Sequence, residues 1–106
     1  MAEVKLMVLY PLPEDVQQFE NDYSAHLSLL HQKMGIPDDA RPYTVTKFQL
    51  GPDDTAPYYQ MFSMPFPSTE ALRQALESPE MQEVAADAVR ISTGGAPVVL
   101  VGSDTD

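Results

Sequence analysis

The sequence has neither cysteine nor tryptophan, and it has few positive charges. Without cysteine the chain forms no disulfide, offers no thiolate nucleophile and lacks the usual ligands of structural zinc, so its stability must come from packing or association. Its 6 Lys and Arg residues are scattered among 16 Asp and Glu, which gives a net charge of -10. Because phosphate binding depends on clustered Lys and Arg, we expect neither nucleic acid nor an anionic membrane surface as a partner.

Long apolar runs are also missing, since the apolar residues occur in short blocks with polar interruptions. A membrane-spanning helix needs about 20 consecutive apolar residues, so none is predicted. The first apolar block, 4–10, follows no cluster of positive charge and is broken by Pro11, unlike a signal peptide. The lack of cysteine fits a reducing compartment, and the expected location is therefore cytoplasmic.

Motifs that hold cofactors or metals are absent from the sequence. It has no Gly-x-Gly-x-x-Gly after a strand, no phosphate loop, no Gly-x-Ser-x-Gly elbow and no cluster of His with spaced carboxylates. We therefore expect no bound metal and no resident cofactor. Any chemistry would run without a metal or with a cofactor that another protein brings.

Strand-like and helix-like patterns alternate along the chain. Strand formers gather in short runs bounded by proline and glycine, and the helical segments place apolar residues at steps of three and four. Pro79 interrupts the second helical segment, so two helices at an angle are expected there. The predicted elements are a strand at 4–10, a helix that opens at Pro13 and closes at Gly35, strands at 43–50 and 58–64 with the second ended by Pro65 and Pro67, helices capped by Ser68 and Ser78, and a strand at 96–101.

This order predicts a single α+β domain, residues 1–106, with the ferredoxin-like βαββαβ plan and a four-stranded antiparallel sheet. Helices cover only one face of such a sheet, so the other face should be polar in a monomer. The strands at 4–10 and 96–101 are instead apolar on both sides. We infer a homodimer that pairs through the sheet face, and the alternative is that the two faces are misassigned.

Both histidines lie in the first helical segment, about 140° apart around its axis, so they cannot share a metal ion as an i, i+4 pair would. His26 falls on the inner flank of the apolar stripe, one turn from Tyr23, whereas His31 is expected in solvent. Two interpretations of His26 stay open. It is either a half-buried side chain hydrogen-bonded to a carbonyl or carboxylate, or a general acid or base at the rim of a pocket.

Aromatic and methionine side chains are frequent for so short a chain, with 5 tyrosines, 4 phenylalanines and 6 methionines. Their ordinary role is core and edge packing. The functional alternative is that some of them line an apolar pocket with adaptable walls. The candidate ligand contacts are Tyr10, Phe19, Tyr43, Tyr58, Phe62 and Met64.

Several segments spread from Val4 to Gly102 carry a family resemblance. They are a strand that ends in LYP, a helix with Tyr23, His26 and Leu27, a PYY entry to the third strand, then STEALRQALESPEMQEVAAD and TGGAPVVLVG. Together they resemble the EthD family of dimeric α+β barrel proteins. The resemblance implies a protomer that pairs through its sheet, and a role linked to the breakdown of ethyl tert-butyl ether beside a cytochrome P450 system. The family's helix motif usually continues His-x-Pro, and Ser28 stands in the place of that proline.

The leading hypothesis is a small homodimer in which each protomer holds an apolar pocket between the first helix and the sheet. His26 and Tyr23 are the candidate catalytic residues at its polar end, with His26 as general acid or base on a small apolar or aromatic oxygenated compound. One alternative is a non-catalytic accessory protein that carries a hydrophobic intermediate. Another is a protein with a closed pocket that acts only by assembly, so whether the chain is an enzyme stays open.

Overall fold

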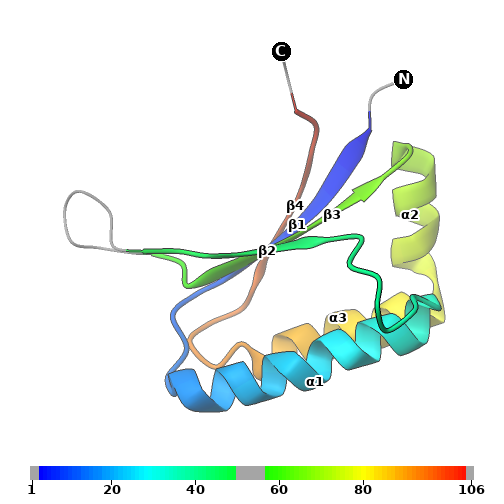
Figure 1. Ribbon diagram of the computed structural model, residues 1–106. Helices are drawn as coiled ribbons and strands as arrows, with labels where there is room; N and C mark the ends of the chain where they lie inside the picture. The colour runs from blue at the N-terminus through cyan, green and yellow to red at the C-terminus, as the bar shows by residue number, and fades with distance from the viewer. Residues whose placement is uncertain (1–2, 50–56, 105–106) are drawn as a thin grey trace.

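The computed structural model describes residues 3–49 and 57–104 (Figure 1). The strands form one sheet in the order β2-β3-β1-β4, and each neighbouring pair is antiparallel. The expected α+β class and ferredoxin-like order are confirmed. The elements are β1 Val4–Tyr10, α1 Val16–Met34, β2 Thr44–Lys47, β3 Gln60–Phe66, α2 Thr69–Glu77, α3 Pro79–Ile91 and β4 Val98–Gly102.

The helices lie on one side of the sheet. Figure 1 shows α1 and α3 running side by side beneath it, while α2 stands at a steep angle to α3. The expected break falls at Ser78 and Pro79. The Ser78 hydroxyl donates to the Ala75 carbonyl at the end of α2 and accepts from the Met81 N–H at the start of α3. One side chain therefore ends one helix and begins the next.

Helix α1 begins at Val16, three residues after the proline at which the sequence places its opening. Asp15 is its N-cap and accepts from the Gln18 N–H at 3.1 Å, and Gly35 ends it with a φ of 68°. Inside the helix the Ser28 hydroxyl donates to the Ser24 carbonyl at 3.3 Å, which keeps a polar side chain satisfied within the turn. In the described residues no helix is long and apolar enough to cross a membrane.

The strand bounds differ in part from those expected. β2 ends at Lys47 rather than at residue 50, which lies outside the described residues, and β4 begins at Val98 rather than at residue 96. β3 begins two residues later than expected and continues through Pro65 to Phe66. Pro65 pairs with Lys5 of β1. On its other side Pro65 has no partner in β2, because the first residue of β2, Thr44, lies opposite Ser63. The missing N–H of Pro65 therefore costs no hydrogen bond on the β2 side.

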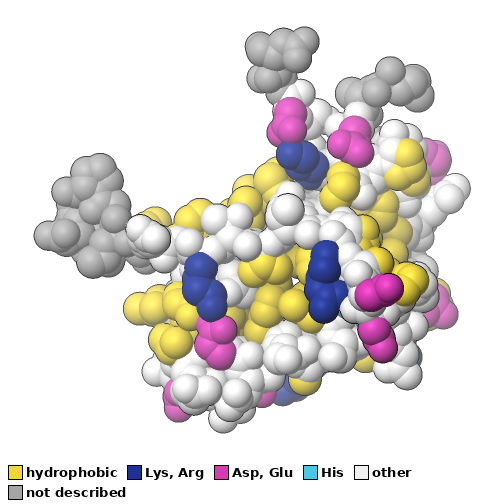
Figure 2. Space-filling model, viewed as in Figure 1, with side chains coloured by type: hydrophobic (Ala, Val, Ile, Leu, Met, Phe, Trp, Pro, Cys, Tyr) yellow, Lys and Arg dark blue, Asp and Glu magenta, His cyan; other side chains and the backbone are white. Residues whose placement is uncertain are grey.

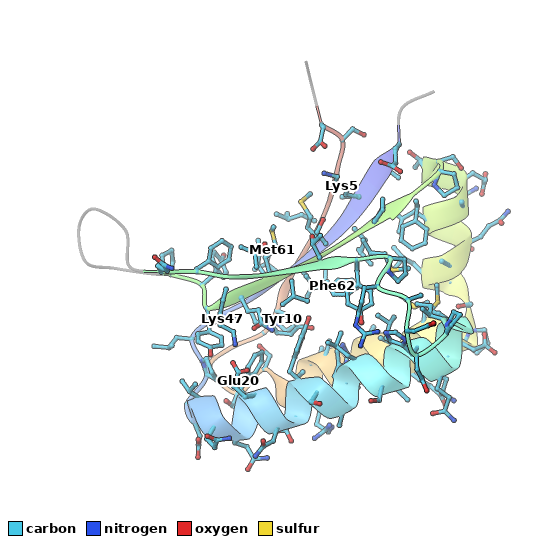
Figure 3. All side chains as sticks on the ribbon, viewed as in Figure 1. Lys5, Tyr10, Glu20, Lys47, Met61 and Phe62 are labelled. Carbon is cyan, nitrogen blue, oxygen red and sulfur yellow. The ribbon has the colours of Figure 1, made fainter. Side chains whose placement is uncertain are left out.

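The side of the sheet toward the helices holds the core. Tyr10 and Phe62 point toward the helices, whereas Met61 and Lys5 point away from them (Figure 3). The buried core residues that pack together on the helix side include Leu6, Met64 and Phe66 of the sheet and Leu30, Leu72 and Val84 of the helices.

The outer face of the sheet, on the side away from the helices, is mostly apolar. The strand register places on it the side chains of Met7, Leu9, Met61, Val98 and Leu100, which we call the outer apolar face. Figure 2 shows yellow side chains along the upper left outline of the molecule, where this face lies in Figure 1. The strands are therefore apolar on both sides in the structure as well, and the two faces are not misassigned.

His31 is buried rather than exposed to solvent, with only 7% of its surface accessible. Its Nε2 accepts from the Tyr43 hydroxyl at 2.7 Å, and its Nδ1 donates to the Pro37 carbonyl at 3.1 Å. The helical period correctly places His31 off the main apolar stripe. The chain that follows α1, however, folds back and covers it with Tyr43, which a helical wheel does not include.

Candidate ligand pocket

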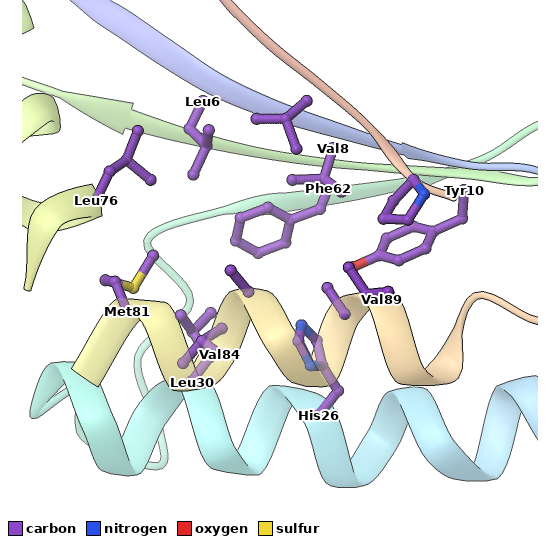
Figure 4. Close-up of a pocket in the computed structure, with 14 residues that line it drawn as sticks. Leu6, Val8, Tyr10, His26, Leu30, Phe62, Leu76, Met81, Val84 and Val89 are labelled. Carbon is purple, nitrogen blue, oxygen red and sulfur yellow. The ribbon is translucent and has the colours of Figure 1, made fainter. Parts of the chain in front are cut away.

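An apolar pocket of about 210 Å³ lies between the sheet and the helices. Its walls come from the sheet above and from the helices below (Figure 4). Apart from His26 and Tyr10, every side chain that lines it is apolar. Leu6, Val8 and Phe62 belong to the strands, and Leu30, Val84 and Ala88 belong to the helices.

The pocket reaches solvent between α3 and the edge strand β4. Leu76, Val89 and Val99 line it and are 36%, 59% and 55% exposed. Val99 faces the same side of the sheet as Val8, but at this edge the helices no longer cover the strand. The mouth of the pocket is therefore apolar as well, which favours the entry of an apolar molecule.

His26 is held by a carboxylate on the neighbouring helix. Its Nδ1 lies 2.8 Å from Oδ2 of Asp87 in α3, and the side chain is 7% exposed. The other carboxylate oxygen of Asp87 accepts a hydrogen bond from Nε of Arg90 at 2.9 Å and forms an ion pair with Nη2 of the same residue at 2.7 Å. The ring end that carries Nε2 points toward the sheet and the pocket (Figure 4). The histidine thus shows one nitrogen to a fixed carboxylate and the other to the cavity.

Burial and charge act on this group in opposite directions. Burial lowers the pKa of His26 below its ordinary 6.5, and the hydrogen bond and charge of Asp87 oppose that effect without overcoming it. Burial alone would raise the pKa of Asp87, but its hydrogen bonds with His26 and Arg90 hold that pKa below 3.8. At neutral pH the imidazole is therefore neutral and the carboxylate is charged. The proton then lies on Nδ1, where it is donated to Asp87, and Nε2 keeps a free lone pair.

Tyr10 supplies the second polar group of the pocket. Its ring packs edge-on against Phe19 and Tyr23, and its hydroxyl oxygen points into the cavity (Figure 4). Burial, together with the negative charge of Asp87, raises the pKa of Tyr10 far above its ordinary value. The hydroxyl therefore stays protonated at any ordinary pH and can donate a hydrogen bond.

Tyr23 lies one turn from His26 but does not line the pocket. Its ring packs against Phe19 and Tyr10 in the core, and its buried hydroxyl has no hydrogen-bond partner among the described residues. Within the same residues, Nε2 of the buried Gln60 also has no partner. Of the two candidate catalytic residues, the structure therefore places only His26 at the cavity.

The candidate ligand contacts separate into two groups. Tyr10 and Phe62 line the pocket together with His26. Phe19 and Met64 are buried in the core beside it, Tyr58 is half-buried just before β3, and Tyr43 lines a separate polar hollow with His31. Whether any of them binds a ligand stays a prediction.

Asp87 and Arg90 were not among the candidate residues. The acid and the base stand three positions apart in the second helical segment, a spacing that indicates an ion pair on one helix face. Nothing in the sequence shows that this face meets α1 at His26, because that contact joins residues 61 positions apart. The sequence therefore predicts a carbonyl or carboxylate partner for His26, but it does not identify that partner as Asp87.

In the described part of the chain, no group of three or more His, Cys, Asp or Glu side chains could hold a metal ion. The arrangement that is present offers proton transfer and hydrogen bonding inside an apolar cavity. These features define the class of the protein, a ferredoxin-like α+β protein with an apolar pocket between its sheet and its helices.

Comparisons with known proteins place the chain within this class. A family model described as the EthD domain matches residues 12–94, and the chain belongs to the EthD family. The expected family is therefore confirmed. No curated protein matches the chain.

Solved structures agree with this assignment. An ethyl tert-butyl ether D (EthD) family protein from Bacillus halodurans has a TM-score of 0.81 and 28% identity, over 97% of this chain and 99% of that chain. An EthD-like protein from Ralstonia eutropha has a TM-score of 0.66 and 22% identity, over 96% and 91%. A protein from Jannaschia described as a dimeric ferredoxin-like protein of unknown function has a TM-score of 0.68 and 14% identity, over 93% and 96%. The last two show the fold alone.

Proposed function

We propose that this protein binds a small apolar or aromatic oxygenated compound in the pocket between its sheet and helices, and that His26 acts on it as a general base. One observation carries the proposal. His26 fixes its Nδ1 on Asp87 while its Nε2 faces a cavity that is otherwise lined by apolar side chains and Tyr10. A merely structural histidine has no need of a cavity at its second nitrogen.

The size of the pocket limits the ligand. An apolar cavity of about 150 Å³ is large enough to bind benzene, and drug-sized ligands occupy pockets of about 300 Å³ or more. At about 210 Å³ the pocket fits one substituted six-membered ring or a branched compound of similar size. A role in the breakdown of such a compound is in line with the ether named in the description of the Bacillus halodurans relative.

The proposed chemistry is the removal of one proton. The neutral imidazole takes a proton at Nε2, and the charged Asp87 stabilises the imidazolium that forms. Tyr10 donates a hydrogen bond to the oxygen on which negative charge develops. The imidazolium can exchange this proton with water that enters through the mouth between α3 and β4, and it then returns a proton to the anion, which restores the neutral imidazole and the neutral compound.

The second candidate function is that of a non-catalytic carrier for a hydrophobic intermediate. The wholly apolar mouth of the pocket favours it, because such a mouth serves uptake and release whether or not any chemistry follows. In this case binding would not depend on proton transfer at His26.

Occupation of the pocket can be tested with a small ketone. Phenylacetone has one ring and an acidic C–H next to its carbonyl, and its binding can be followed by NMR titration. Ala88→Leu should abolish binding because it fills the cavity, and Ala86→Leu, on the exposed side of the same helix, should leave it unchanged. Equal binding to both variants would overturn the pocket as the site.

Catalysis is tested with the same ketone dissolved in D₂O. A general base exchanges the acidic hydrogens for deuterium in three steps. The base removes a proton, the imidazolium that forms exchanges it for a deuteron from the solvent, and the imidazolium then returns that deuteron to the same carbon. The wild type should accelerate this exchange, and His26→Gln should lose at least tenfold of the acceleration while still binding the ketone. Binding without accelerated exchange would reject the catalytic role and favour the carrier.

We also propose that the protein is a cytoplasmic homodimer that pairs through the outer apolar face. An exposed apolar sheet face is a liability in a monomer, and similarly folded proteins such as the one from Jannaschia are described as dimeric. Leu100→Asp places a charge on the outer apolar face, in the edge strand β4, on a residue that is 46% exposed. This variant should be a folded monomer in light scattering. The control Leu12→Asp, at a 60% exposed loop position, should remain a dimer. A wild-type protein that is monomeric in light scattering would contradict this proposal.

A further inference from the structure

We propose that Asp87, held in place by Arg90, is a positioning residue that fixes the tautomer of His26, so that the pocket selects a neutral hydroxyl-bearing aromatic compound of the phenol class. The inference rests on the proposed function, since it assumes that the pocket binds a ligand. It adds which kind of polar group the ligand carries and which residue outside the pocket determines that preference.

The first step is the orientation of Asp87. Each of its two oxygens has its own partner, because Oδ2 faces Nδ1 of His26, and Oδ1 accepts a hydrogen bond from Nε of Arg90 and forms an ion pair with its Nη2. The carboxylate is therefore charged and cannot rotate freely, with 17% of its side chain exposed. An ionised carboxylate only accepts hydrogen bonds, so the nitrogen that faces it must carry the proton.

The second step is the effect on the opposite nitrogen. A neutral imidazole has one N–H, and with that proton on Nδ1 the nitrogen Nε2 is an acceptor. The other groups near the ring do not change this assignment. Tyr23 of α1 lies with its ring centre 5.8 Å away and is neutral, and Tyr10 of β1 is a hydroxyl that stays protonated.

The third step is the match between pocket and ligand. The cavity offers one acceptor at Nε2 and one hydroxyl at Tyr10, and its remaining lining is apolar. A phenol donates its O–H to Nε2, and its oxygen accepts from Tyr10. A ligand with a carboxylate would lose its hydration against the apolar wall and would bring a second negative charge near Asp87. A ligand with an ammonium group would also lose its hydration, and no carboxylate lines the pocket to pair with it.

The experiment compares 4-methylphenol with p-xylene, which has the same shape, and with 4-methylanisole, in which a methyl group replaces the hydroxyl proton, by NMR titration or calorimetry. In a wholly apolar pocket p-xylene binds most tightly, because the phenol must give up its hydrogen bonds to water. The proposal predicts the opposite order, with 4-methylphenol bound about tenfold more tightly than p-xylene and the methyl ether weakest, since it has no proton to donate.

Two variants test the role of Asp87. In Asp87→Asn the side-chain amide can donate to Nδ1, which moves the ring proton to Nε2, so the preference for 4-methylphenol over 4-methylanisole should fall about tenfold or reverse. Nitrogen-15 NMR of the His26 ring should report the change of tautomer directly. Glu83→Gln makes the same acid-to-amide change on an exposed residue of α3 that pairs with Lys33, and it should leave both readouts unchanged.

The outcomes separate the two proposals. If none of the three probes binds, the pocket itself is not a ligand site and the proposed function fails. If they bind with p-xylene tightest, the pocket stands but the phenol preference is wrong. A ring that keeps its proton on Nδ1 in Asp87→Asn would show that Asp87 does not fix the tautomer. Should that variant not fold, Arg90→Gln releases the carboxylate from its anchor and must still weaken the preference.

Discussion

The imidazole of His26 responds to two opposed effects, and the stronger is burial. Buried histidines lose the charged form because the interior solvates an imidazolium poorly, and the charged Asp87 recovers only part of that loss. The native state therefore binds a proton at His26 less readily than the unfolded chain does. Stability must depend on pH through this difference.

The free energy of unfolding should fall as the pH is lowered from about 7.5 to 5. The sign follows from the lowered pKa of His26, since below its ordinary value of 6.5 the unfolded chain takes up a proton that the native state resists. His26→Gln removes this group, so the stability of the variant should change less over the same pH range. Urea unfolding at several pH values measures the difference, and parallel curves would contradict it.

The two histidines also show how far a residue can be interpreted from sequence. The helical period correctly places His26 on the inner flank, because the contacts that decide this belong to one helix. The period fails for His31, since its burial depends on Tyr43, twelve residues further along in a segment with a different course. Asp87 was missed for the same reason, because its contact with His26 joins two helices.

At the scale of elements, the joint between α2 and α3 depends on Ser78. Its hydroxyl bonds the end of one helix and the start of the next, and Pro79 follows at a position where a helix needs no N–H. The sequence predicts this joint from local signals alone. Pro65 is the opposite case, because whether a proline ends a strand depends on how long the neighbouring strand is, and that length is not a local property.

Ser78→Ala should lower the free energy of unfolding by about 1 to 2 kcal/mol, since it removes one acceptor and one donor from two helix ends. Ser68→Ala, which removes only the N-cap of α2, is the matched comparison and should cost about 1 kcal/mol or less. The midpoint of urea unfolding gives both values, provided that its slope is unchanged. If Ser78→Ala lowers the free energy of unfolding less than Ser68→Ala does, the second hydrogen bond of Ser78 adds no stability.

At the scale of the whole molecule, the element order could be predicted and the pocket could not. Each strand and helix has its own local signal, and few arrangements join them in this order without a crossing connection. The pocket instead requires side chains such as Val8, Leu30 and Val99 to come together from different elements. Its volume depends on how closely the helices approach the sheet, and no residue pattern encodes that distance.

The charge of the whole chain predicts how salt affects association. Each chain carries a net charge of -10, so two copies repel one another, while the outer apolar face through which we propose that they pair contributes few charges of its own. Raising the salt concentration from about 20 to 500 mM screens this repulsion, and it also strengthens the burial of apolar surface to a smaller extent. The dimer should therefore be tighter in high salt and persist to lower protein concentrations. Sedimentation equilibrium at several protein concentrations measures this, with Leu100→Asp as the control that stays monomeric throughout. A dimer that weakens in high salt would show that ion pairs, such as one made by Lys5, hold the two copies together instead of apolar contact.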